Sequence, residues 1–230
     1  MKNKESILNT MKSTAAKMIV ALGIGLLLLA SAPATALSTV EAKEQRLVVI
    51  IVDWARVRRE LRAEPVSGPD RKAMQERSRL LSMSAQRLVK ELRPEFMSDP
   101  PAPTREVFRY VLSLARKYRP EEEASLQSEF DHFLVEETKT LLNTLRAGLE
   151  NYLADRAEYP KPENLPLSKA ISSTYVRLPE TLFDQAGRII DYWGRPIVYR
   201  SMGPHEYVLY SIGPNGKDEG GQGDDVKPSG

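Results

Sequence analysis

The spacing of apolar residues changes once along this chain, at Tyr159 and Pro160, and that change limits the folds that the chain can adopt. Before this point, apolar residues recur at the spacing of one helix face; after it, prolines break the chain into loops and short runs rich in β-formers. Helices followed by a few strands predict an α+β fold. With 230 residues and 41% hydrophobic content, the chain can bury one or two ordinary cores.

Prolines and capping residues set the ends of four predicted helices. The β-branched run Val48–Val52 also suits a strand, but the apolar residues around it fall at helical spacing, which favours a helix. The arginines of this first helix alternate with glutamates and indicate a solvated face. The predicted helices cover residues 47–61 (ending before Pro65), Asp70 to the residue before Pro94, Thr104–Tyr118 and about Glu121–Asp155, with a proline-rich linker over Ser98–Thr104.

Two runs after the loop-rich stretch predict an antiparallel hairpin. They are R-P-I-V-Y-R-S and E-Y-V-L-Y-S-I, and the segment M-G-P-H joins them. We expect the last helix to cover one face of this small sheet, which gives an α+β architecture. The predicted organisation is a signal peptide over residues 1–36, a helical region over 37–120 and a C-terminal domain over 121–230.

The first 36 residues have the parts of an export signal. A basic stretch extends to Lys17, an apolar run follows from Met18 to Ala32, and the next residues, 34–36, read Ala-Thr-Ala, a small-x-small cleavage site. Because this apolar run is shorter than the ~20 residues that span a bilayer, we expect cleavage before Leu37 and export to the periplasm or the exterior. The alternative is retention of the segment as an inner-membrane anchor.

The composition argues against an enzyme and against a nucleic-acid-binding protein. The chain has no cysteine and only two histidines, His132 and His205, and it lacks G-x-S-x-G and H-E-x-x-H arrangements. Without the leader its formal net charge is −1, and no basic patch is interleaved with aromatic residues. We therefore expect protein partners, no nucleic acid and no small-molecule substrate, with membrane contact only if the leader is retained.

Near the C-terminus, Ser211–Val226 reads S-I-G-P-N-G-K-D-E-G-G-Q-G-D-D-V, which is rich in glycine and contains four acids. Glycines let backbone carbonyls turn inward, and four side chains offer further oxygens. Calcium takes about 6–8 oxygen ligands in flexible geometry, which such a loop can supply. The stretch lacks the EF-hand spacing. It predicts either a calcium-binding loop or a solvated acidic tail; the four side chains are Asn215, Asp218, Asp224 and Asp225.

Three motifs occur in a fixed order in this part of the chain. A helix ends in L-E-N-Y-L-A-D-R-A-E-Y-P, a turn reads D-Y-W-G-R-P-I-V-Y-R, and the strand E-Y-V-L-Y-S-I leads into the acidic loop. Together they resemble the C-terminal domain of the major pseudopilin of type II secretion systems, over roughly Thr138–Val226. The resemblance implies a pilin-like fold, a structural calcium ion and protein–protein contacts in a secretion or pilus-like assembly.

The resemblance also implies which groups would bind the calcium ion. By motif position, these are the carbonyl of Ile212, the side chain of Asn215 and the carboxylate of Asp224, with Asp225 or Asp218 as further ligands. Asn215 is a departure, because the family usually has an aspartate there. A neutral amide oxygen still binds a cation, but it attracts one less strongly than a carboxylate does.

The N-terminus departs further from the family. Pseudopilins carry a short basic leader, a glycine at which a prepilin peptidase cuts, and F-T-L-x-E at the start of a long membrane helix. Here Gly23 and Gly25 lie inside the apolar run, and no such motif follows them. We therefore expect an exported, non-enzymatic component or accessory of a type II secretion or pilus-like assembly. The alternative is a membrane-anchored helical scaffold or a binding module unrelated to secretion.

Overall fold

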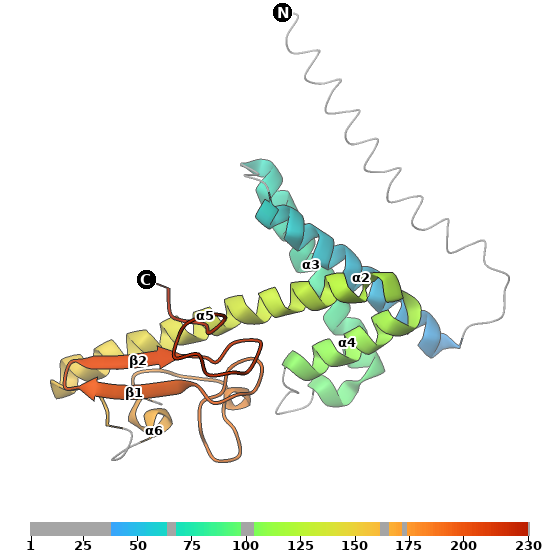
Figure 1. The fold of residues 1–230 in the computed structure, drawn as a ribbon. Helices are drawn as coiled ribbons and strands as arrows, with labels where there is room; N and C mark the ends of the chain where they lie inside the picture. The colour runs from blue at the N-terminus through green and yellow to red at the C-terminus, as the bar shows by residue number, and fades with distance from the viewer. Residues whose placement is uncertain (1–37, 64–67, 98–103, 162–165, 172–173, 230) are drawn as a thin grey trace, which may run out of the picture. The chain divides into compact units, whose positions relative to one another are not determined.

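The longest element among the residues that the structure describes is a single helix, which contributes to two hydrophobic cores. This helix, α5 (Glu123–Arg156), has 34 residues. The computed structural model describes residues 38–63, 68–97, 104–161, 166–171 and 174–229 (Figure 1). The predicted signal peptide over residues 1–36 and most of the predicted linker over Ser98–Thr104 lie outside the described residues.

The β-branched run Val48–Val52 is helical, as predicted. Leu47, Val48, Ile51 and Trp54 are all buried, and their spacing places them on one face of a helix. Burial of that face outweighs the β-propensity of the run. The elements before α5 are α2 (Thr39–Ala63), α3 (Pro69–Leu92), the 3₁₀ turn η1 (Pro94–Met97), α4 (Thr104–Tyr118) and the 3₁₀ turn η2 (Pro120–Glu122).

The helix ends follow the local sequence closely. The predicted cap of α3 at Asp70 is wrong by a small margin, because the helix already starts at Pro69, which occupies the first turn, after Gly68 with φ 68°. Proline suits this position, since its missing N–H would have no partner inside the helix. The bounds of α4 match the prediction, and α5 ends at Arg156, followed by Ala157 as the C-cap in the left-handed conformation with φ 59°.

A small antiparallel hairpin lies against α5 (Figure 1). Its strands, β1 (Val198–Gly203) and β2 (Glu206–Tyr210), pair Val198 with Tyr210 and Gly203 with Glu206, so Pro204 and His205 form the turn. The predicted α+β fold, with a long helix on a small sheet, is confirmed. The remaining elements are α6 (Leu167–Ile171) and the 3₁₀ turn η3 (Glu180–Leu182).

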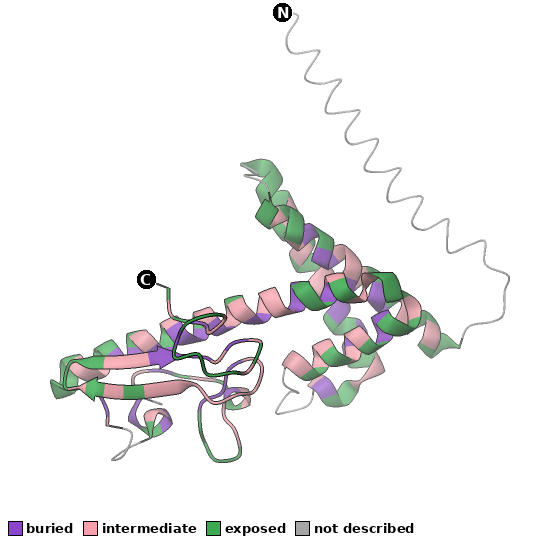
Figure 2. Ribbon diagram, viewed as in Figure 1, coloured by how far each residue is buried: buried purple, intermediate pink, exposed green. Residues whose placement is uncertain are grey.

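Two hydrophobic cores share α5 (Figure 2). Leu126 and Phe130, near its start, pack with α2, α3 and α4, whereas Leu142, Leu145 and Leu149 pack with the hairpin and the loops around it. None of the helices in the described residues is both long and apolar enough to cross a membrane.

A buried ion pair joins α2 to α5. The Glu129 side chain is fully buried, and its Oε1 accepts hydrogen bonds from Arg58 Nε at 3.0 Å and Arg62 Nη1 at 2.8 Å. Burial acts to raise the pKa of Glu129, but the two guanidinium groups outweigh it, and the pKa lies below its usual value. Interpreting the arginines of α2 as a solvated face is therefore wrong for these two, which fix the packing of two helices.

Candidate metal centre

The acidic stretch after β2 is a loop closed at its base. The N–H of Ser211 donates to the carbonyl of Val226 at 2.9 Å, and the N–H of Val226 donates back to Ser211 at 2.9 Å. Both residues are buried, which fixes the two ends of the loop on the edge of the sheet. Of the two predicted alternatives, the stretch thus has the closed form and not that of a solvated tail.

A buried carboxylate anchors the base of the loop to the preceding turn. Asp191 accepts hydrogen bonds from the Ser211 hydroxyl at 2.6 Å and from the N–H groups of Trp193 and Arg195, both at 2.9 Å. Its burial raises its pKa above the usual value, while these donors act in the opposite direction. The W-G-R-P turn and the acidic loop are therefore connected through one side chain.

Arg195 makes a second connection between the turn and the loop. Its guanidinium donates to the carbonyl of Gly213 and, at 3.1 Å, to the carbonyl of Pro214. Gly213 and Pro214 lie near the start of the acidic loop, so Arg195 holds the first residues of the loop against the turn. The loop is thus positioned by the sheet at its base and by an arginine along its first turn.

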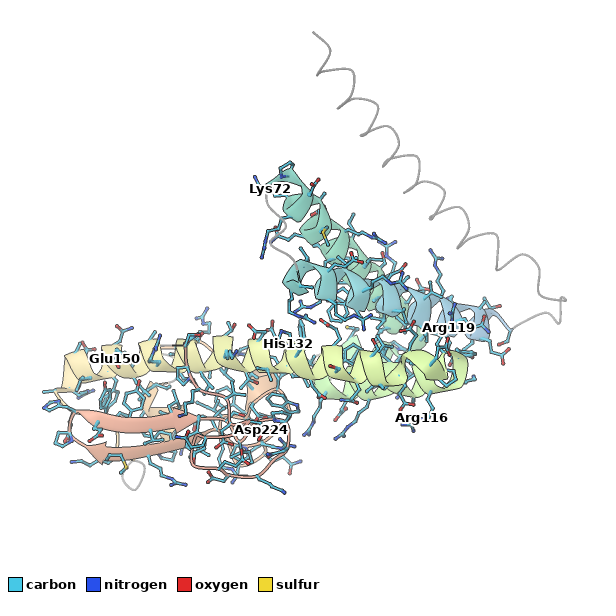
Figure 3. All side chains as sticks on the ribbon, turned by 45° about the horizontal axis from the view of Figure 1, so that its top comes forward. Lys72, Arg116, Arg119, His132, Glu150 and Asp224 are labelled. Carbon is cyan, nitrogen blue, oxygen red and sulfur yellow. The ribbon has the colours of Figure 1, made fainter. Side chains whose placement is uncertain are left out.

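Inside the loop, three carboxylates come together, one of them that of Asp224, which is labelled in Figure 3. One oxygen from each of Glu219, Asp224 and Asp225 lies within 4.8 Å of the others. Asp225 Oδ2 accepts the N–H groups of Glu219 at 3.1 Å and Gly221 at 2.7 Å, whereas its Oδ1 is buried and has no hydrogen-bond partner. Such a group is costly unless another partner is present, and a cation would supply one.

Hydrogen bonds connect Asn215, near the start of the loop, to Asp224 of this cluster, near the end of the loop. Asp224 accepts the N–H of Asn215 at 2.9 Å and also the side-chain amide of Asn215, while the N–H of Asp224 donates to Glu219 at 3.0 Å. The side-chain oxygen of Asn215 accepts the N–H of Lys217 at 2.6 Å. These bonds fold the chain so that residues near each end of the loop lie side by side.

Two glycines make this close approach possible. Gly213 has φ 62°, and a Cβ there would overlap the carbonyl oxygen of Asp224; Gly223 has φ 56°, and a Cβ there would overlap the Glu219 carboxylate. The positive φ strains a larger residue at both positions, and at Gly213 the overlap with a backbone carbonyl adds to this, whereas the Glu219 side chain could move away from a Cβ at Gly223. The spacing of glycines therefore has a structural reason at these two positions.

The predicted ligand residues divide into two groups. Asn215, Asp224 and Asp225 lie at the cluster, and Ile212 lies at the entrance of the loop. Asp218 instead accepts hydrogen bonds from the Tyr210 hydroxyl at 2.6 Å and the Gly220 N–H at 3.0 Å, and its other oxygen pairs with Arg200 at 3.2 Å. These donors lower the pKa of Asp218.

Glu219 is the member of the cluster that the sequence reasoning missed. It is followed by Gly220 and Gly221, both with positive φ, which turn the chain back toward Asp224 and Asp225. A glycine pair directly after an acid was the available signal, since it permits such a reversal. The preceding acid, Asp218, instead contacts Tyr210 of β2 and Arg200 of β1.

A hollow of about 390 Å³ is lined mainly by apolar side chains, and its charged lining groups are Arg105, Glu137 and Asp191. No histidine lines it. His205 is exposed in the hairpin turn, and His132 is half-buried on α5 (Figure 3). Within the described residues, neither histidine belongs to the carboxylate cluster.

A long helix packed on a small antiparallel sheet, with the C-terminal segment closed back onto that sheet, defines a pilin-like domain. Residues 126–228 match the family model described as "Type II secretion system (T2SS), protein G". The resemblance to the major pseudopilin is thereby confirmed for the C-terminal domain, which is under half of the chain. A search of curated proteins and a search of solved structures find no match.

Proposed function

We propose that this protein is an exported, non-enzymatic component or accessory of a type II secretion assembly, acting through contacts with other proteins. The observation that carries the proposal is the family match over residues 126–228, which coincides with the pilin-like domain. The leader lacks the prepilin pattern, and that pattern opens the helix by which pseudopilins pack into a filament. We therefore propose that the protein acts beside the filament or at its periphery.

Removal of the gene from its own host tests the role in secretion. We expect proteins that normally reach the medium to accumulate in the envelope, and the unaltered gene to restore their release. Fractionation of the same cells should place the protein in the envelope or outside it. An unchanged set of secreted proteins in the deletion strain would contradict the proposal.

The second part of the proposal is that the domain is stabilised by a structural calcium ion in the loop. Glu219, Asp224 and Asp225 would supply carboxylate oxygens, and backbone carbonyls near Ile212 would add further hard oxygen ligands. Asn215 would join them by turning its side-chain amide over, because the amide nitrogen now donates to Asp224 and the amide oxygen accepts the N–H of Lys217. The ion would supply positive charge and would bridge segments far apart in the loop. The buried, partnerless Oδ1 of Asp225 supports this assignment.

The charges around the loop support the same assignment. Elsewhere in the domain, Asp184 pairs with Arg188 at 2.7 Å and Asp218 pairs with Arg200 at 3.2 Å. Among the described residues, no lysine or arginine forms such a pair with any member of the three-carboxylate cluster. Three adjacent negative charges repel one another, and a divalent cation removes that repulsion.

Thermal unfolding of the full chain, followed by circular dichroism, tests the calcium site. Calcium in excess over a chelator should raise the Tm, because an ion that binds only the folded state stabilises it by about 2.7 kcal/mol at 100 times its Kd. Asp225→Asn should abolish the rise. Magnesium should have a smaller effect, because it prefers a stricter octahedron.

Asp218→Asn is the matched control, since Asp218 lies in the same loop but binds Tyr210 and Arg200. It should keep the calcium-dependent rise in Tm. A Tm that does not respond to calcium would contradict the proposed ion. Loss of the response in Asp218→Asn, with the response kept in Asp225→Asn, would instead place the ion on the other side of the loop.

A further inference from the structure

Helix α3 has an exposed face directly opposite the face that it buries. Its buried residues are Ala85, Leu88 and Val89, and its first sixteen residues include no buried one. A second set of residues, spaced by four, four, three, four and four positions, lies on the other side of the helix. These six residues, all exposed, are Lys72, Glu76, Leu80, Met83, Arg87 and Glu91; we call them the α3 stripe.

The centre of the α3 stripe is apolar. Leu80 is 50% exposed and Met83 is 49% exposed, and they follow one another on successive turns. Few large hydrophobic residues are so exposed in the described part of the chain, and these two are the pair that share one helix face. Two adjacent apolar side chains in the middle of a charged stripe are typical of a helix–helix contact.

The charges on either side of this centre have a self-complementary order. Along α3 the stripe reads basic, acidic, apolar, apolar, basic, acidic. If a second copy of the helix lies antiparallel across it, with Leu80 opposite Met83, then Glu76 faces Arg87 and Lys72 faces Glu91. A parallel arrangement would place like charges opposite each other at all four charged positions, which is unfavourable.

We propose that the α3 stripe is a dimer interface, in which it packs antiparallel against the same stripe of a second copy of this chain. Such a contact is isologous, since each copy contributes the same surface and the contacts occur twice. The proposal rests on α3 alone and does not depend on a role in secretion or on calcium.

The contacts of the monomer leave the stripe available. Glu76 pairs with Arg79 at 2.6 Å and Glu91 pairs with Lys43 at 2.8 Å, and all four of these side chains are substantially exposed. Among the described residues, the side chains of Lys72 and Arg87 form no hydrogen bond or ion pair, and Figure 3 shows Lys72 at the end of the helix. The pKa of Glu91 is lowered first by Lys43 and, less strongly, by Arg87 of the same helix. Lys72 is thus free to meet an acid of a second copy, whereas Arg87 would exchange its exposed attraction to Glu91 for a contact with Glu76 of that copy.

The size of the stripe sets the strength that we expect. One helix face on each copy buries less than the ~1,600 Å² of a standard protein complex, so the dimer should be weak and should form at high protein concentration. Its charged contacts are exposed, so added salt should weaken it.

Sedimentation velocity of the full chain over a range of concentrations tests the proposal. The unaltered protein should shift toward dimer as its concentration rises. Glu76→Arg and Arg87→Glu should each weaken the dimer about tenfold or more, because each creates two like-charge contacts. Both positions are exposed, so circular dichroism should show an unchanged fold.

Mixing these two variants gives the sharper result. In a mixed dimer, the two arginines of Glu76→Arg face the two glutamates of Arg87→Glu, so an equimolar mixture should recover the dimer that neither variant forms alone. A protein that stays monomeric at all concentrations would overturn the proposal. So would variants that dimerise as the unaltered chain does, or a mixture that fails to recover.

Cysteine cross-linking tests the direction of the pairing, and the chain has no cysteine of its own. Under mild oxidation, a mixture of the single variants Leu80→Cys and Met83→Cys should form disulfide-linked dimers faster than either variant alone. Faster cross-linking of each variant with itself would indicate parallel helices and would overturn the antiparallel register, as would an absence of cross-linking in all three samples.

Discussion

The helical region and the C-terminal domain are held together by different kinds of contact. In the core that the helical region shares with the start of α5, aromatic rings pack on one another, and Phe108 stacks on Phe130 at 4.0 Å between ring centroids. The C-terminal domain also has aromatic pairs, such as Tyr159 with Tyr207, but in addition five of its aspartates each accept at least one backbone N–H. They are Asp184, Asp191, Asp218, Asp224 and Asp225.

The difference follows from where the backbone finds its hydrogen bonds. Helices satisfy most of their own N–H and C=O groups, so side chains there are free to pack. A domain of turns and loops must satisfy its backbone with side chains, and aspartate does so well. The five aspartates of the C-terminal domain therefore have a structural role, because they accept hydrogen bonds from backbone N–H groups in its turns and loops.

The two regions also differ in charge. Residues 37–120 contain 18 lysines and arginines against 11 acids, a net charge of +7, whereas residues 121–230 contain 11 against 19, a net charge of −8. The near-neutral total conceals this division. Arg58 and Arg62 of the first region bind the buried Glu129 of the second. We expect the largest loss of stability when these ion pairs are broken.

Replacement of both Arg58 and Arg62 by alanine should destabilise the protein by about 3–5 kcal/mol, because it leaves the buried Glu129 carboxylate unpaired. Urea unfolding monitored by circular dichroism measures this. Adding Glu129→Gln should restore part of the loss, since the unpaired charge is gone. A double variant as stable as the original would show that the two regions do not depend on this pair.

Asp191→Ala should cost about 2–4 kcal/mol, because it removes the acceptor of two N–H groups and of the Ser211 hydroxyl. Asp191→Asn keeps an acceptor and should cost less than about 1.5 kcal/mol. Urea unfolding of both variants gives the comparison. Equal losses would mean that the charge, and not the hydrogen bonds, holds the loop to the turn.

The same residue gives a pH dependence. The folded-state pKa of Asp191 is raised, so its contribution to stability is fully present below its unfolded pKa of about 3.9 and is lost as the pH rises through the folded value. In Asp191→Asn, the decline in stability over that window should disappear. A pH–stability curve that keeps the same decline would assign it to another group.

Gly213→Ala should destabilise the C-terminal domain by about 1–3 kcal/mol, because φ 62° is strained for alanine and its Cβ would overlap the carbonyl of Asp224. Gly187→Ala is the matched control, since Gly187 has φ 72° but open space around it. A larger loss at Gly213 than at Gly187, measured by thermal unfolding, would isolate the contact from the backbone strain.

Arg200→Ala should have the smallest effect, below about 1 kcal/mol, because its ion pair with Asp218 is exposed on both sides. Raising the salt concentration should remove even that difference. A loss above 2 kcal/mol in urea unfolding would show that the strand side of the loop is held more firmly than its exposure indicates.

Much of the fold could be predicted from the sequence because it depends on local chemistry. Pro65, Pro94 and Pro120 mark where helices end, and the apolar spacing identifies the faces that α2 and α5 bury. The hairpin follows from two β-forming runs around Pro204 and His205. The predicted starts of α3 and α5, at Asp70 and about Glu121, differ by one or two residues from the observed starts at Pro69 and Glu123, because capping positions are decided over one or two residues.

The candidate site was predicted only in part. Asn215, Asp224 and Asp225 were found because all lie in one glycine-rich segment, whereas Glu219 was missed although Gly220 and Gly221 directly follow it. Asp218 instead binds the Tyr210 hydroxyl of β2 and the Arg200 side chain of β1. These contacts form only because the two strands lie beside the loop in the folded protein.

The sequence by itself therefore determined the helices, the hairpin and the presence of an acidic loop, because spacing and turn residues act over a few positions. Tertiary structure alone decided which acids of the loop form the carboxylate cluster, that Glu129 meets two arginines of α2, and that Asp191 joins the turn to Ser211. Each of these needs residues from distant parts of the chain to be packed side by side, and their chemistry is set by that packing.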